Sequence, residues 1–149
     1  TLHLLSKMPD ARRAELEEQR LLSPLAAGSN VVVHNGVSDE EYAELLESTH
    51  ALVTASRAEG YGLPVVEAQA AGCPAVISDI DIFREIAPHA VFAPVTEDPQ
   101  ADARAWVEAI RSLEDETVRD HVILKGLQDA SHYSWRDSAL KLVRVVKGL

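Results

Sequence analysis

Residues 56–76, SRAEGYGLPVVEAQAAGCPAV, contain side chains that suit the binding of an anion between two hydroxyl-bearing groups. Glu59 and Glu67 flank a loop that contains Gly60 and Gly62. Glycine lets the backbone approach a ligand closely, and the amides at the start of a helix favour an anion such as a diphosphate. Carboxylates accept hydrogen bonds from paired hydroxyls. The segment therefore fits a nucleotide-sugar, and the alternative is an ordinary strand-to-helix turn with two solvated glutamates.

The elements around this loop predict a position at which parallel sheets bind ligands. A short apolar strand over residues 51–55 precedes the loop, and Pro64 suits the first turn of a helix over residues 64–71. In an open parallel sheet, ligands bind at the carboxyl ends of the strands, in the loops that lead into helices. The two glutamates therefore stand where such a fold is expected to bind a ligand.

Short apolar segments alternate with helical patterns over the first two thirds of the chain. We expect strands over residues 2–5, 31–34, 51–55, 75–78 and 90–93, and helices over residues 9–22, 39–48 and 64–71. The strands are apolar throughout, which is typical of strands covered on both faces. This alternation predicts an α/β fold with a Rossmann-like parallel sheet and flanking helices. From residue 99 onward only helices are expected, over residues 103–113, 118–130 and 135–146.

Length, charge and cysteine content limit the possible functions. The 149 residues fit one domain. A formal net charge of -10 disfavours nucleic acid as a partner, and a single cysteine, Cys73, excludes a disulfide framework and is expected to be buried. No apolar run approaches the ~18 residues of a membrane span, and Thr1 opens no signal segment, so we expect a cytoplasmic location.

Other side chains that could bind a metal ion or a ligand give weaker signals. Asp79 and Asp81 have the spacing of a metal-binding acidic pair, but a polar loop after the strand over residues 75–78 is the favoured interpretation. Trp106 and Trp135 lie in helical patterns and are expected to pack. The acidic residues 114–116 are expected to form a solvated turn. Six histidines lack paired metal-ligand spacing: His3, His34, His50, His89, His121 and His132.

The segments EGYGLPVVE and AQAAGCPAVISD resemble the signature of retaining glycosyltransferases of the GT-B fold, a group that includes bacterial mannosyl- and glucosyltransferases. The first segment, residues 59–67, matches the two-glutamate motif of that family. VVVHNGVSDEEYAELLESTHALVTAS is similar to the preceding strand, helix and strand, and YSWRDSALKLVRVV to the closing helix. The resemblance covers nearly the whole chain and is most specific over residues 52–88.

The resemblance implies a role for each matching position. Glu59 is expected to contact hydroxyls of the transferred sugar and is the expected catalytic residue, and Glu67 is expected to bind the ribose hydroxyls. Donor-binding backbone is implied at these residues: Gly60, Tyr61, Gly62 and Leu63 beside the sugar and diphosphate, and Asn35, Gly36 and Val37 near the base. The implied activity is metal-independent hexosyl transfer without a cofactor, from a nucleotide-diphosphate sugar to an acceptor hydroxyl, with a membrane-associated acceptor among those the family allows.

The resemblance also implies parts that this sequence does not contain. Members of the family begin this domain with a strand and helix that supply an arginine and a lysine for the diphosphate, whereas the first strand expected here resembles the second strand of the family. Residues 1–149 are therefore expected to be the donor-binding domain, the C-terminal half of a GT-B fold without its first strand and helix. Without the N-terminal acceptor-binding domain, we expect this chain alone to be inactive.

A noncatalytic α/β interaction or regulatory module, such as a receiver-like domain, is the competing hypothesis. A receiver would carry clustered aspartates at the end of an early strand, and the strands that end at Leu5 and His34 lack them. A dinucleotide-binding dehydrogenase is disfavoured because no G-x-G-x-x-G follows a strand.

Overall fold

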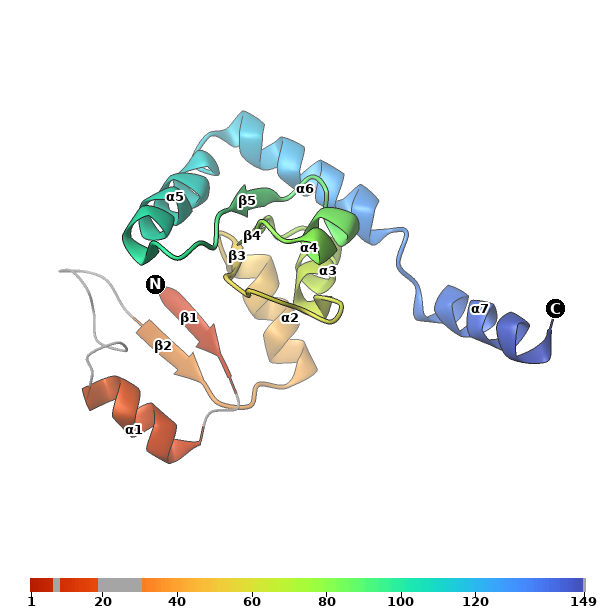
Figure 1. Ribbon diagram of the computed structural model, residues 1–149, viewed down its shortest axis with the longest axis horizontal. Coiled ribbons are helices and arrows are strands. Elements are labelled where there is room, and N and C mark those ends of the chain that lie inside the picture. Colours follow the sequence, from red (N-terminus) through yellow and green to blue (C-terminus); the bar gives the residue numbers. More distant parts are fainter. Residues whose placement is uncertain (7–8, 19–30, 149) are drawn as a thin grey trace. The chain divides into compact units, whose positions relative to one another are not determined.

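The computed structural model describes residues 1–6, 9–18 and 31–148 of the chain. Two compact units can be distinguished, Thr1–Tyr42 and Ala43–Leu149. Figure 1 shows the helices and strands of both.

The first unit contains a parallel pair of strands. β1 (Leu2–Leu5) pairs with β2 (Val31–His34) in the register Leu2 to Val31 and Leu5 to His34. These two strands have the expected bounds. The expected helix over residues 9–22 is present as α1 (Asp10–Glu18), and its positions 19–22 lie outside the described residues.

Ser38 begins the next helix, α2 (Asp39–Ser48), which has the expected bounds and extends from the first unit into the second. The Ser38 hydroxyl accepts a hydrogen bond from the Glu41 amide at 3.2 Å, and the Glu41 carboxylate accepts one from the Ser38 amide at 2.8 Å. This reciprocal pair is a capping box, which satisfies two amides that the helix cannot pair internally. Ser38 is therefore the N-cap of α2.

The second unit contains a three-stranded parallel sheet in the order β3-β4-β5. Its strands are β3 (Leu52–Thr54), β4 (Ala75–Ser78) and β5 (Val91–Ala93). Its helices are α3 (Leu63–Ala70), α4 (Asp81–Ile86), α5 (Pro99–Ser112), α6 (Glu116–Ala130) and α7 (Trp135–Lys147). The predicted α/β class and parallel pairing are confirmed, but the described strands pair in two sets and not in one continuous sheet.

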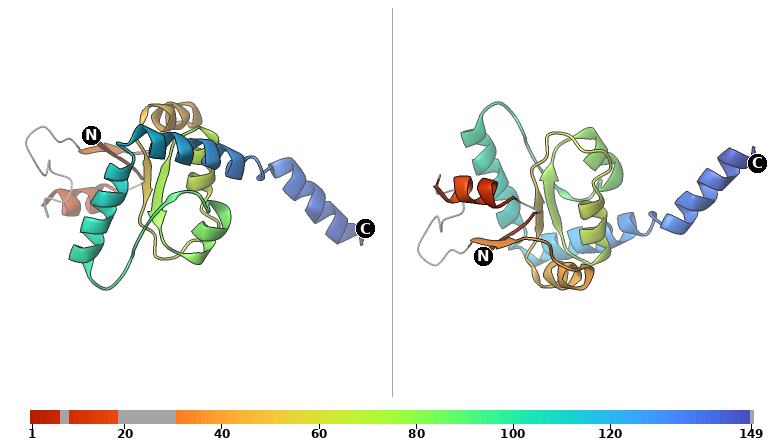
Figure 2. Two further views of the ribbon diagram at one scale, coloured as in Figure 1. Left: turned by 90° about the horizontal axis from the view of Figure 1, so that it is seen from above. Right: turned by 90° about the horizontal axis from the view of Figure 1, so that it is seen from below.

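The central strand β4 organises the core of this unit, because every residue in it is buried. Ala75 and Ile77 pack with Val65 of α3 and with Phe83 of α4, whereas Val76 packs in a second cluster that includes Leu113. Figure 2 shows α5 on one side of the sheet and α3 and α4 on the other. The expectation of a strand covered on both faces is confirmed for β4.

Helix α4 differs from the sequence prediction, which placed residues 79–81 in a polar loop and assigned no helix after them. Asp79 does lie in the loop, but Asp81 is the first residue of α4. This helix has only six residues, too few to establish an apolar periodicity. It nevertheless buries Phe83 and Ile86 completely or nearly so, and thereby contributes much of the core.

The two tryptophans have different environments. Trp106 is half-buried and donates a hydrogen bond from its indole Nε1 to the carbonyl oxygen of Pro94 at 2.9 Å, as expected for a packed residue. Trp135 is 81% exposed, so the expectation that it packs is wrong. It occupies the first position of α7, where the capping residue Ser134 orients the chain and few neighbours surround the side chain.

Further expectations on single residues are confirmed. Cys73 is buried, and burial raises the pKa of its thiol. Asp115 caps α6 by accepting hydrogen bonds from the amides of Thr117 and Val118, and the acidic residues around it are exposed. Among the described residues, none of the helices combines the length and apolar character that crossing a membrane requires.

Gly62 gives a direct test of this packing. Its φ of +81° is in the left-handed region, and a Cβ there would lie 2.7 Å from Cε1 of Phe83 and 3.0 Å from Cδ1 of Ile86. Backbone strain and overpacking together predict that Gly62→Ala lowers the free energy of unfolding by about 2 to 5 kcal/mol. Urea denaturation measures this loss.

Gly60→Ala is the matched control. Gly60 lies two residues earlier in the same loop, its φ is not in the left-handed region, and a Cβ there meets nothing within 4 Å. We expect a change of less than about 0.5 kcal/mol. Equal losses at the two positions would contradict the packing argument.

Candidate functional site

The loop between β3 and α3 ends at Gly62, the N-cap of α3. No side chain caps this helix start, and Pro64 occupies its first turn. A backbone in the left-handed region at Gly62 allows the chain to turn directly from the loop into the helix. Amides at an uncapped helix start, together with the positive end of the helix dipole, attract anions. This end of α3 can therefore bind a phosphate group.

Glu59 lies in the same loop, exposed to solvent. Its carboxylate accepts a hydrogen bond from the hydroxyl of Ser56 at 2.6 Å. This contact restricts the orientation of the carboxylate and leaves it further lone pairs for a ligand hydroxyl. No local pattern in the sequence indicates a role for Ser56, and its contact with Glu59 is known only from the structure.

Glu67 lies one turn into α3 and is also exposed. It follows Leu63 by four residues, so both side chains lie on one face of the helix. The loop and helix thus carry all of Glu59, Gly60, Tyr61, Gly62, Leu63 and Glu67 within one short segment of the second unit.

The remaining expected site residues belong to the first unit. Asn35, Gly36 and Val37 follow the carboxyl end of β2, as expected. Gly36 has a φ of +81° and open space where a Cβ would lie, so its backbone is accessible to a ligand. These residues and the Glu59 loop belong to different units, and their proximity to one another stays a prediction.

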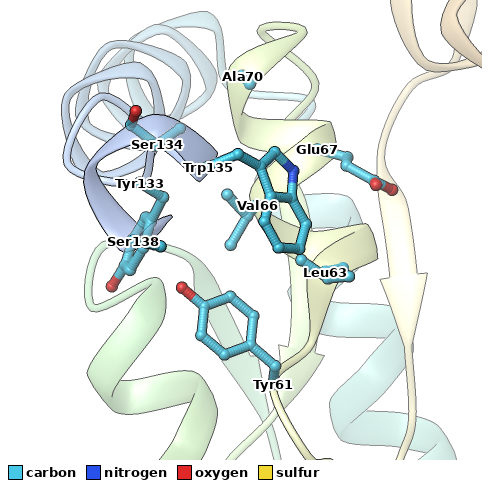
Figure 3. A pocket seen from close by; sticks show the side chains of 10 residues that line it. Tyr61, Leu63, Val66, Glu67, Ala70, Tyr133, Ser134, Trp135 and Ser138 are labelled. Carbon is cyan, nitrogen blue, oxygen red and sulfur yellow. The ribbon is translucent and has the colours of Figure 1, made fainter. Parts of the chain in front are cut away.

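A cavity of about 350 Å³ adjoins the Glu67 face of α3. Figure 3 shows its aromatic side chains, with the rings of Tyr61, Tyr133 and Trp135 around Val66. The rings of Tyr61 and Tyr133 meet edge to face with centroids 6.0 Å apart. The cavity is lined by Tyr61, Leu63, Val66, Glu67, Ala70, Ala130, Tyr133, Ser134, Trp135 and Ser138.

The sequence predicts only three of the ten residues that line this cavity as site residues, namely Tyr61, Leu63 and Glu67. Tyr133, Ser134, Trp135 and Ser138 come from the turn after α6 and from the start of α7. They lie about seventy residues away in the chain, and no local spacing links them to α3. The packing of α3 on α6 brings them to this cavity.

Asp79, one of the two aspartates with metal-ligand spacing, contacts Arg84. The guanidinium of Arg84 donates to both oxygens of Asp79, from Nε at 2.5 Å and from Nη2 at 2.7 Å. The hydrogen bond that Arg84 donates to Asp79, and then the negative charge of that carboxylate, raise the pKa of Arg84. A carboxylate engaged in this bidentate pair is poorly available to a cation. Within the described residues, no cluster of three histidine, cysteine, aspartate or glutamate side chains suits a metal ion.

Tyr133 is the ionisable residue of the cavity with a perturbed pKa. Burial raises the pKa of its phenol, and the proximity of Tyr61, Glu85 and Asp129 raises it further. The neutral phenol is therefore favoured in the folded chain. Because an unfolded tyrosine ionises near pH 10, stabilisation by the neutral phenol is complete below about pH 10 and is lost as the pH rises through the folded pKa.

The raised pKa of Tyr133 predicts how stability depends on pH in a variant without this phenol. The free energy of unfolding should decrease less steeply above about pH 10 in Tyr133→Phe than in the unchanged chain. In a pH titration followed by tyrosinate absorbance, the same variant should lose a component that ionises at raised pH. Tyr61→Phe is the control, because it removes one cause of the shift and should leave Tyr133 titrating at a lower pH. If Tyr133→Phe instead removed a component that ionises at or below the ordinary tyrosine pKa, the assignment would be contradicted.

The chain is similar in sequence to known glycosyltransferases. The chain is 28% identical over 111 residues to O-antigen chain mannosyltransferase B of Escherichia coli, covering 74% of this chain and 28% of that protein. It is 33% identical over 108 residues to the serotype-specific mannosyltransferase WbdA of Escherichia coli, covering 72% and 12%. It is 30% identical over 129 residues to D-inositol 3-phosphate glycosyltransferase 1 of Catenulispora acidiphila, covering 86% and 30%. The chain spans less than a third of each of these relatives.

Solved structures share the fold. WaaG, a glycosyltransferase involved in lipopolysaccharide biosynthesis, superposes with a TM-score of 0.69 at 18% identity, over 99% of this chain and 38% of WaaG. The GtfA/B complex superposes with a TM-score of 0.70 at 22% identity, over 99% of this chain and 29% of that one. The fold is thus of the GT-B glycosyltransferase type. Residues 13–127 match the family described as glycosyl transferases group 1, and the chain belongs to that family.

Proposed function

We propose that this chain binds the donor of a retaining glycosyltransferase, a nucleotide-diphosphate sugar. The observation that carries the proposal is the start of α3, where Gly62 forms an N-cap without a capping side chain between two exposed glutamates. A diphosphate at this helix start would have a carboxylate on each side. Those carboxylates can accept hydrogen bonds from the hydroxyls of the two sugars that the diphosphate joins.

Each expected residue has a part in this proposal. Glu59 binds hydroxyls of the transferred sugar, and Glu67 binds the ribose hydroxyls. Backbone amides of Tyr61, Gly62 and Leu63 contact the sugar and the diphosphate. Gly60 allows the loop to approach the donor. The space beside it is open, because a Cβ at this position would meet nothing within 4 Å. A residue without a side chain leaves the backbone accessible there.

The turn after β2 has the remaining part, which is to contact the base. Asn35, Gly36 and Val37 follow a parallel strand at its carboxyl end, the end at which such sheets bind ligands. The left-handed backbone of Gly36 leaves the peptide groups on either side uncovered by a side chain. Contacts through backbone would accept more than one base.

The proposed reaction moves a hexosyl group to an acceptor hydroxyl with retention at the anomeric carbon. The acceptor attacks the face from which the diphosphate departs, and neither glutamate is a nucleophile. Negative charge accumulates on the departing diphosphate, and the amides and dipole at the start of α3 stabilise that charge. Glu59 stabilises the positive character that develops on the sugar.

Transfer also requires that the acceptor be held in one water-excluding cleft with the donor. Because this chain spans less than a third of the relatives described above, we propose that the acceptor is bound by a further domain. The chain alone should then bind donor without transferring its sugar. A cytoplasmic location and a membrane-associated acceptor belong to the same proposal.

The two glutamates can be separated by experiment. In the complete enzyme, Glu67→Ala removes charge-assisted hydrogen bonds worth about 1.5 to 3 kcal/mol and should weaken nucleotide and nucleotide-sugar binding alike, by roughly 10-fold to 150-fold. Glu59→Ala should lower turnover strongly and leave the affinity for free nucleoside diphosphate nearly unchanged. Calorimetry and steady-state kinetics measure the two effects.

Glu108→Ala serves as the control, because Glu108 is an exposed glutamate on α5. This variant should change neither the nucleotide affinity nor the turnover. Equal losses of nucleotide affinity in the Glu59 and Glu67 variants would contradict the division of roles. Unchanged behaviour in both would reduce the segment to a strand-to-helix turn.

Metal dependence gives an independent test on the chain itself. Diphosphate binding rests on amides and a helix dipole, so we expect weak affinity that magnesium and manganese do not alter. Titration of a nucleoside diphosphate, with divalent cation and then with a chelator, should give the same dissociation constant within about twofold. A tenfold gain with metal that Asp79→Asn abolishes would contradict the proposal.

A further inference from the structure

Arg57 joins the Glu59 loop to a distant turn of the same unit. Its Nη2 donates a hydrogen bond to the carbonyl oxygen of Thr96 at 3.0 Å, and its Nη1 contacts the Glu97 carboxylate at 3.3 Å. Thr96 and Glu97 lie between β5 and α5. This long-range contact therefore connects the loops that follow β3 and β5.

The turn that receives Arg57 is itself well fixed. The carboxylate of Asp102 accepts hydrogen bonds from the Thr96 amide at 2.7 Å and from its hydroxyl at 2.8 Å. The Thr96 hydroxyl accepts one from the Asp98 amide at 3.1 Å. Asp98 in turn caps α5 by accepting from the amides of Gln100 and Ala101. The Thr96 carbonyl is thus held at the start of a 14-residue helix.

On the other side of Arg57, the loop holds the Glu59 carboxylate. Ser56 precedes Arg57 and donates its hydroxyl hydrogen bond to Glu59 at 2.6 Å. A continuous series of contacts therefore links the α5 cap to Glu59. It passes through Thr96 and Arg57 and then through the adjoining peptide groups to Ser56. Without the Arg57 contact, the loop between Ala55 and Gly62 would have greater conformational freedom.

We propose that Arg57 is a positioning residue, which holds the loop so that the Glu59 carboxylate stays in place for the transferred sugar. This inference rests on the proposed function, because it requires that Glu59 contacts the donor. The alternative is that Arg57 itself binds the diphosphate. The geometry favours positioning, because the guanidinium is already directed to the Thr96 carbonyl and to Glu97.

The two contacts of Arg57 contribute unequally to holding the loop. The ion pair is solvent-exposed, with 62% of the Arg57 side chain and 97% of the Glu97 side chain accessible, and such pairs contribute little. The hydrogen bond to a fixed carbonyl is the contact that constrains the loop. A guanidinium directs two donors at once from a planar group, whereas a lysine ammonium has no such fork. Lysine should therefore replace Arg57 poorly.

Amide hydrogen exchange on the chain tests the tether. Arg57→Gln and Arg57→Lys should each speed exchange in the segment over residues 56–61 by about tenfold or more, while Glu97→Gln leaves it near the unchanged rate. Arg104→Gln is the matched control, because Arg104 is an exposed arginine on α5. Unchanged exchange in Arg57→Gln would overturn the inference.

Kinetics of the complete enzyme test the purpose of the tether. Arg57→Gln should lower kcat about tenfold to a hundredfold, because small displacements of a catalytic group have effects of this size, with less than twofold change in nucleoside diphosphate affinity. Diphosphate affinity that falls in Arg57→Gln, returns in Arg57→Lys and depends steeply on salt would show a direct phosphate contact and overturn positioning.

Glu59→Gln separates this inference from the proposed function. If Glu59→Gln leaves turnover unchanged, the role of Glu59 is wrong, whatever the exchange data show. If Glu59→Gln lowers turnover and Arg57→Gln does not, the role of Glu59 stands and the positioning role is overturned. In the expected case, both lower turnover, and adding Arg57→Gln to Glu59→Gln has little further effect.

Discussion

The close contact between Gly62 and Phe83 determines the geometry of the candidate site. Phe83 and Ile86 are buried against β4, and they leave room at the start of α3 for a residue without a side chain. Because Gly62 also has a left-handed backbone, no other residue type combines the required conformation with the required space. The amides at the helix start, and both glutamates beside it, owe their positions to this contact. A short helix in the core, α4, thus acts on the site without contributing a residue to it.

The electrostatics of the site raise a question, since an acidic chain is proposed to bind an acidic ligand. The net charge of -10 opposes the approach of a diphosphate from a distance. The arginines nearest the loop in sequence are engaged elsewhere, Arg57 with Thr96 and Glu97 and Arg84 with Asp79. Within the described part of the second unit, the proposed anion binding therefore rests on backbone amides and the dipole of α3. These groups act at short range, and the amides are directional donors.

The aromatic cavity connects this loop to the C-terminal helices. Tyr61 lies between Gly60 and Gly62 of the loop and meets Tyr133 edge to face, so the position of the loop is sensitive to the turn after α6. Close packing of α3 on α6 supports the arrangement, because Gly126 allows α6 to approach Gln69 of α3. The Glu59 loop is thus constrained from two directions, by Arg57 through the β5-α5 turn and by Tyr61 through the cavity.

The sequence by itself determined the α/β class, most element boundaries and the location of the two-glutamate segment at a strand-to-helix junction. These features are local: the alternation of apolar runs and the proline in the first turn of α3 are both read within a few residues. The tertiary structure decided the rest, namely α4, the exposure of Trp135, and the contacts of Arg57 and Tyr133. A helix of six residues is too short for periodicity to identify, and a side chain at the start of a terminal helix has neighbours that periodicity does not specify. The partners of Arg57 and Tyr61 lie about forty and seventy residues away, and such contacts exist only after the chain has packed.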